Sequence, residues 1–108
     1  MKQRNFRESA KLFESHLNDS DLKPSAKIGI MAWIAECYLK AGDMGQAAKW
    51  SESAGKAALS CEDLPRHEKL RRALEEFDRA IGYYEAANDF GGMGRAASLK
   101  YGLDPSLL

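Results

Sequence analysis

The chain has 108 residues, of which 44% are hydrophobic, and its sixteen Lys and Arg residues balance sixteen Asp and Glu residues. A chain of this length is expected to form a single domain, over residues 1–108, with enough core to fold without disulfides or metals. The zero net charge argues against a dedicated nucleic-acid binder, which usually carries an excess of basic residues.

The cysteines and the N-terminus indicate a cellular compartment. Cys37 lies in an apolar run and Cys61 near an expected helix start, where a thiolate is mildly stabilised. They form no CxxC pair, so both are expected to be reduced thiols. The polar N-terminus does not resemble a signal peptide, and no apolar run approaches the ~20 residues of a membrane span. The sequence therefore predicts a cytoplasmic protein with no membrane partner.

The first two expected helices come from apolar residues that recur at helical spacing. Asn5 followed by Glu8 resembles a capping box, which predicts a helix over residues 6–17. A second helix is expected over residues 25–41, behind Pro24. Its apolar side chains occupy two faces, so one face must meet another helix or a partner. The second face carries Ile30, Trp33 and Cys37.

Three further helices are expected downstream, each behind a turn. Asp43 is expected to cap the third helix, which is rich in alanine, and Asp89 to cap the fifth. The fourth helix has an apolar stripe centred on Phe77, with Glu76 on its polar side. Its expected i,i+4 ion pairs are Glu68–Arg72 and Glu75–Arg79. The stripe of the fifth helix consists of Phe90, Met93, Ala97 and Tyr101. No strand is expected, so the fold class is all-α, with about five helices in consecutive antiparallel hairpins.

A glycine-rich stretch in the fifth helix has the G-x-G-x-x-A spacing of a dinucleotide-binding turn, from Gly92 to Ala97. That motif requires a preceding strand, whereas the residues before Asp89 have the pattern of an amphipathic helix. We therefore interpret the stretch as a loosened helix start. No binding of NAD, FAD or ATP is expected, and the sequence suggests no other cofactor.

The turns of the chain repeat one another and resemble a known family. Tyr38 and Gly42-Asp43 recur 46 residues further on as Tyr84 and Asn88-Asp89. This pattern, with small residues such as Ala35, Ala47 and Ala54, resembles tetratricopeptide-repeat (TPR) proteins with degenerate repeats. The terminal Leu103-Asp104-Pro105 also fits the family pattern. The resemblance implies a fragment of a right-handed superhelix, and the single domain could be a piece of a longer array of repeats.

The TPR resemblance also implies a function, namely a non-catalytic scaffold that binds a protein or peptide on its concave face. The partner-binding residues expected on that face are Trp33, Glu36, Lys40, Asp78, Arg79 and Glu85. Their mixture of acidic and apolar groups favours a basic or amphipathic segment as the partner. The alternative is a structural module that associates with itself, as a homodimer or as a piece of a larger array.

Other residues with chemical potential have simpler interpretations. His16 and His67 lack the spacing of a zinc-binding helix, so they are expected to be solvated, and no metal site is expected. A basic cluster around Arg71 and Arg72 is interleaved with acidic residues, which favours an ordinary solvated helix face. Trp33 and Trp50 are either core residues or, for one of them, a partner contact.

Overall fold

The computed structural model describes residues 3–103 and contains five α-helices, with no strand in that range. The helices are α1 (Gln3–His16), α2 (Pro24–Lys40), α3 (Met44–Leu59), α4 (Arg66–Ala86) and α5 (Phe90–Tyr101). This confirms the all-α fold class predicted from helical periodicity. The predicted match at Leu103-Asp104-Pro105 extends beyond the described residues.

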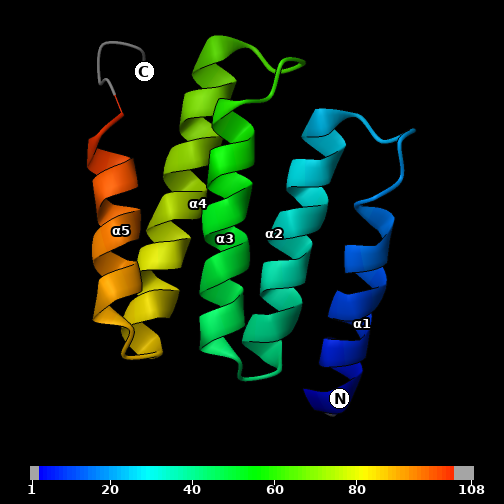
Figure 1. The fold of residues 1–108 in the computed structure, drawn as a ribbon, viewed down its shortest axis with the longest axis vertical. Helices are drawn as coiled ribbons and strands as arrows, with labels where there is room; N and C mark the ends of the chain where they lie inside the picture. Colours follow the sequence, from blue (N-terminus) through cyan, green and yellow to red (C-terminus); the bar gives the residue numbers. More distant parts are fainter. Residues whose placement is uncertain (1–2, 104–108) are drawn as a thin grey trace.

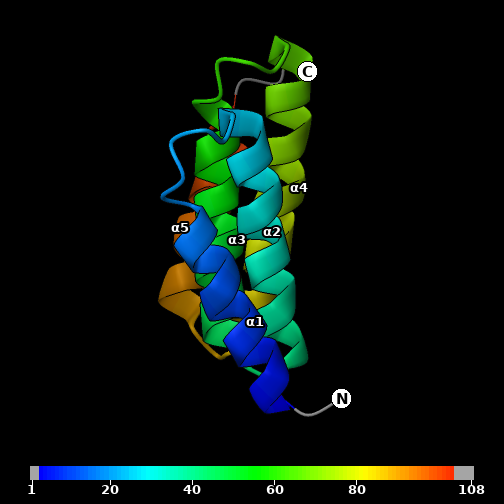
Figure 2. The same ribbon diagram turned by 90° about the vertical axis from the view of Figure 1, so that its right-hand side faces the viewer.

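The five helices lie side by side in chain order and alternate in direction (Figure 1). Each helix packs chiefly on its neighbours in the sequence, and the most extensive packing joins α3 to α4. In the view of Figure 2, α3 and α5 lie on one side of the molecule and α2 and α4 on the other. The molecule measures 44 × 36 × 18 Å, so it is a thin slab with two open edges, one at α1 and one at α5.

The turns after α2 and α4 have nearly the same geometry. Asp43 has φ −97° and ψ 81°, and Asp89 has φ −98° and ψ 83°. Each carboxylate accepts a hydrogen bond from the backbone N–H three residues later, which satisfies a free donor of the helix start. The residue before each cap has positive φ, 82° at Gly42 and 58° at Asn88. The predicted caps are therefore confirmed, and the two turns are alike.

Two local predictions for the terminal helices are wrong. Helix α1 already includes Asn5, so Asn5 does not form a capping box with Glu8. On α5, Phe90 and Tyr101 are 62% and 78% exposed and do not join a buried stripe. The two fully buried residues of α5, Gly92 and Ala96, are small, which lets the helix lie close to α4, and Met93 packs partly against the core.

The core lies between successive helices and depends on small residues that let the backbones approach. Phe77 is fully buried against Ala54 and Ala58 of α3, as its place in the α4 stripe predicts. An added Cβ at Gly55 would lie 2.5 Å from the Phe77 ring, and one at Gly92 would lie 2.5 Å from the Tyr84 ring. These glycines therefore set the spacing of α3 and α5 from α4.

The polar side of α4 differs from the prediction. Glu76 is fully buried, although helical spacing assigned it to the polar face. Its Oε2 lies 3.1 Å from Arg79 and 3.4 Å from Arg72. Neither predicted i,i+4 pair is present among the described residues, and Glu68 instead contacts Arg71 at 2.6 Å. Because α4 has neighbours on more than one side, a residue on its nominally polar face also becomes enclosed.

Candidate functional site

An apolar groove lies at the α1 edge of the slab, with a volume of about 390 Å³. Five residues line it, Phe13 of α1 and Ala26, Gly29, Ile30 and Trp33 of α2, and we call it the Trp33 groove. The Phe13 and Trp33 rings meet edge to face, with centroids 6.2 Å apart. Trp33 is nevertheless 54% exposed, so α1 covers this face of α2 only in part.

The burial along this face of α2 explains where the groove opens. Cys37 is buried in a cluster with Ala10 of α1, and Ile30 packs partly against the same cluster. Trp33 projects beyond it and is the exposed member of the three. Helix α1 therefore covers part of the second apolar face, which was expected to meet another helix or a partner. Trp50 is half-buried on α3 and packs against the same cluster.

Of the six predicted partner-binding residues, only Trp33 lines the groove. The nearby Lys40 ammonium lies 5.8 Å from the centre of the Phe6 ring, in a cation–π contact with α1. Glu36 is half-buried and acts electrostatically on Tyr83 of α4. Burial first, and then the Glu36 charge, raises the pKa of Tyr83.

The three predicted residues on α4 lie apart from the groove and do not form a single site. Arg79 contacts the buried Glu76 and also lies within electrostatic range of Tyr83. Asp78 contacts Lys100 of α5 at 2.6 Å, so it lies on the α5 side of α4. Glu85 is exposed near the end of α4. Helical spacing placed these residues on one helix correctly, but it did not show which neighbour each would meet.

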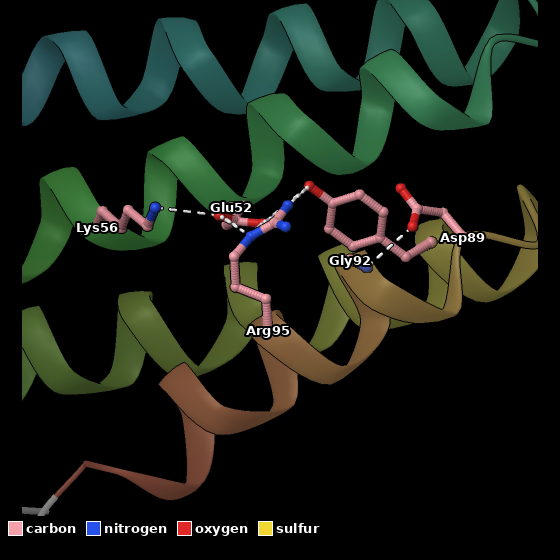
Figure 3. A network of polar contacts seen from close by, with 6 residues as sticks. Glu52, Lys56, Asp89, Gly92 and Arg95 are labelled. Carbon is pink, nitrogen blue, oxygen red and sulfur yellow. Dashed lines mark hydrogen bonds and ion pairs between the residues drawn. The ribbon is translucent and has the colours of Figure 1, made fainter.

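A second site, which is polar, joins α3, α4 and α5 (Figure 3). The Tyr84 hydroxyl donates a hydrogen bond to Glu52 Oε1 at 2.8 Å. Arg95 donates to both Glu52 oxygens and, at 2.9 Å, to the Tyr84 hydroxyl. Lys56 completes this Glu52 network with an ion pair of 3.0 Å. Both oxygens of Glu52 are thus paired within the chain, which indicates a structural role.

The electrostatics of the Glu52 network agree with that interpretation. Burial alone would raise the pKa of Glu52, but the hydrogen bonds from Arg95, Tyr84 and Lys56 outweigh it and lower the pKa. Burial and the neighbouring carboxylate raise the pKa of Tyr84 to about 12. At neutral pH the network therefore joins an ionised glutamate and a neutral tyrosine to the Arg95 guanidinium.

Sequence reasoning missed the Glu52 network, although a weak signal was present. Glu52 lies among buried small residues of α3, one helical turn from Ala48 and Gly55. A charge among small residues on an expected core face requires a partner, because an unpaired buried charge is costly. The partner Arg95 is 43 residues away, and the sequence does not indicate it.

The described residues carry few groups suited to catalysis or to metal binding. Both cysteines are buried, free thiols, and burial raises the pKa of Cys61, so its expected thiolate stabilisation is wrong. Both histidines are exposed, and no group of three or more His, Cys, Asp or Glu side chains in the described range could hold a metal. Gly92 and Gly94 lie within α5, directly after the turn from helix α4.

Comparison with known proteins found no matching family model, no matching curated protein and no matching solved structure. Within residues 3–103, no helix is long and apolar enough to cross a bilayer.

Proposed function

We propose that this chain is a non-catalytic, TPR-like scaffold that binds an amphipathic helix of another protein in the Trp33 groove. The observation that carries the proposal is the exposure of Trp33 in an open apolar groove. Tryptophan is frequent among residues that dominate binding energy, and exposed apolar patches commonly mark partner sites.

The packing of α2 beside α4 supports a helix as the occupant. The two similar turns are 46 residues apart, and the same offset relates α2 to α4. Ile30 then corresponds to Glu76, and Trp33 corresponds to Arg79. Glu76 is fully enclosed, and α2 lies beside α4, since Ile28 shares a core cluster with Ala73 and Phe77. Helix α2 thus flanks α4 at Ala73 and Phe77, although Arg79 stays exposed, and a partner helix has the shape to cover the exposed part of α2.

One acidic side chain of α2 favours a basic flank on that helix. Glu36 lies one turn after Trp33 and is half-buried. A cationic side chain at the rim of the partner would meet it, while apolar side chains would contact Phe13, Ile30 and Trp33. An amphipathic helix with Leu on one face and Lys or Arg on the other satisfies both requirements.

The test uses a Trp50→Phe background, in which Trp33 is the only tryptophan, and titrates designed Leu/Lys amphipathic helical peptides. We expect a saturable blue shift of Trp33 fluorescence, because the partner removes water from the indole. Measured by calorimetry in the natural background, Trp33→Ala should weaken binding by ~1–2 kcal/mol, about 5- to 30-fold. Tyr101→Ala, which removes an exposed aromatic at the other edge, is the matched control and should bind normally. A scrambled peptide that binds equally well would show that the groove does not select an amphipathic helix.

Self-association is the second candidate, and the exposed aromatics of α5 favour it. Phe90 and Tyr101 are exposed residues of α5, the helix at the edge of the slab opposite α1. The α5 edge of one copy could therefore meet the Trp33 groove of another, in a head-to-tail contact. Sedimentation at rising concentration separates the two functions. If the chain self-associates, Tyr101→Ala and Trp33→Ala should each reduce the assembled fraction. If the chain stays monomeric at all concentrations, peptide binding is the function that remains.

A further inference from the structure

Two tyrosines at corresponding positions each bond to a glutamate of the preceding helix. Tyr84 of α4 donates to Glu52 of α3 at 2.8 Å, and Tyr38 of α2 donates to Glu14 of α1 at 3.2 Å. The two tyrosines are 46 residues apart, the same offset that relates the caps Asp43 and Asp89. The slab thus contains two tyrosine–carboxylate pairs whose tyrosines correspond, although the glutamates do not share the offset, since Glu14 corresponds to Ser60.

In the Tyr84–Glu52 pair, an arginine of the next helix, α5, closes the site. The Arg95 guanidinium donates to both oxygens of Glu52 and to the Tyr84 hydroxyl, and it lies 5.5 Å from the centre of the Tyr84 ring. The molecule therefore shows which group complements a carboxylate and a tyrosine hydroxyl in this geometry. A guanidinium satisfies both through its planar set of donors.

In the Tyr38–Glu14 pair, the place that corresponds to that of Arg95 is a pocket of about 270 Å³ between α1 and α3. We call it the Glu14 pocket, after the residues that line it, which are Glu14, Gln46, Lys49, Trp50 and Ser53. Lys49 is the counterpart of Arg95 in the 46-residue offset, and among the described residues it forms no ion pair with Glu14. The volume is just below the range of about 300–1,000 Å³ typical of small-molecule sites, so it suits a single side-chain group.

We propose that the Glu14 pocket binds a guanidinium group. The Glu14 carboxylate is the acceptor, as Glu52 is for Arg95, and the Tyr38 hydroxyl lies beside it. Trp50 lines the pocket with an aromatic surface against which a guanidinium can stack. This pocket lies between α1 and α3, separate from the Trp33 groove, and does not depend on the function proposed for that groove.

The other charges around the pocket permit this assignment. Arg7 is a second cation near Tyr38, but it is paired with Asp43 at 3.1 Å and is thus already neutralised. Lys49 is exposed, so its ammonium can turn into solvent when a guanidinium enters. A residual repulsion between Lys49 and the guanidinium is expected to weaken binding, so removal of the Lys49 charge should strengthen it.

The experiment follows the Trp50 indole N–H resonance by NMR in a Trp33→Phe background. The probes are acetyl-Gly-Arg-Gly-amide, the same peptide with Lys in place of Arg, and free L-arginine. We expect a saturable shift with the Arg peptide and binding at least tenfold weaker with the Lys peptide, which lacks the planar fork. Binding of L-arginine alone would identify a free guanidino compound as the ligand, and binding of the peptide would identify an arginine within a chain.

Two variants at position 49 form a matched pair that leaves the core intact. Lys49→Arg recreates the arrangement of Arg95, so its own guanidinium should occupy the pocket and abolish binding of the added peptide. Lys49→Gln removes the repulsion and should bind at least as tightly as the parent. Glu14→Gln should weaken binding at least tenfold, and thermal unfolding of each variant checks its fold. Equal binding by Lys49→Arg and Lys49→Gln, or unchanged binding by Glu14→Gln, would overturn the proposal.

Discussion

Glu52 and Glu76 are both buried glutamates, and their pKa values are shifted in opposite directions. Burial raises the pKa of Glu76, and the charges of Arg79 and Arg72 do not compensate. Glu76 Oε1 has no hydrogen-bond partner, whereas both oxygens of Glu52 accept bonds from Arg95. Glu76 is the more deeply buried of the two and has fewer donors aimed at it, and both differences favour the opposite signs of the two shifts.

The two shifts have opposite consequences for stability. A carboxyl with a lowered pKa, such as Glu52, stabilises the fold above its unfolded pKa and loses that contribution as pH falls through the folded pKa. A carboxyl with a raised pKa, such as Glu76, contributes fully below its unfolded pKa. That contribution is lost as pH rises through the folded pKa, because ionisation then favours the unfolded chain.

Replacement of Glu76 by glutamine tests this at the residue scale. Glutamine keeps the shape but does not ionise, so the melting temperature relative to the parent should be higher at pH 7 than at pH 4. Glu62→Gln, which removes an exposed carboxyl in the turn before α4, provides the control for the loss of one acidic group. Thermal unfolding followed by circular dichroism at both pH values measures the difference. If the Glu76→Gln difference is the same at both pH values, the folded-state pKa of Glu76 is not raised.

At the scale of elements, α5 is a short helix that contains glycines in two different surroundings. Gly92 is buried, and a Cβ there would lie 2.5 Å from the Tyr84 ring, which is itself buried. A Cβ at Gly94 would meet nothing within 4 Å. The first glycine therefore permits close packing of α5 on α4, while the second only lowers helix propensity.

Alanine substitutions at these two positions should change stability in opposite directions. Gly92→Ala should destabilise the protein by ~1–3 kcal/mol, because the enclosed ring or the whole of α5 must move. Gly94→Ala should stabilise it by ~0.5–1 kcal/mol through helix propensity. Chemical denaturation gives both free energies of unfolding. Two variants of equal stability would contradict the close approach of α5 to Tyr84.

At the scale of the molecule, the slab consists of helices that contact mainly their neighbours in the chain. The most extensive packing joins α3 and α4, and the largest fully buried side chains include Phe77 and Tyr84, both on α4. Helix α1 packs on α2 at one edge, and α5 packs on α4 at the other. Such an arrangement is expected to open from its edges, because edge helices have fewer buried contacts.

Hydrogen exchange should therefore vary in a defined order along the chain. Amides in the middle of α3 and α4 should exchange most slowly, at rates close to those of global unfolding. Amides of α1 should exchange fastest among the helices, since α1 has a single main neighbour and leaves the Trp33 groove open. Exchange measured by NMR under native conditions provides the rates. Equal protection in all five helices would mean that the slab unfolds as one unit.

The sequence by itself determined the features that depend on neighbours within a few residues. The five helices follow from apolar spacing, and the turns follow from caps such as Asp43 and Asp89, whose carboxylates bond three residues ahead. Phe77 was predictable as a core residue because it lies at the centre of the apolar stripe of α4. Pro24 at the start of α2 is another local signal, because its fixed φ suits the first turn of a helix.

Only the tertiary structure decided which side of each helix meets another. Glu76 is buried despite its charge, Trp33 is exposed despite its size, and Arg95 reaches a glutamate 43 residues away. The Trp33 groove and the Glu14 pocket likewise combine residues of two helices. The physical reason is that periodicity defines a helix face, whereas burial and pairing depend on the distance and angle at which a second helix approaches it.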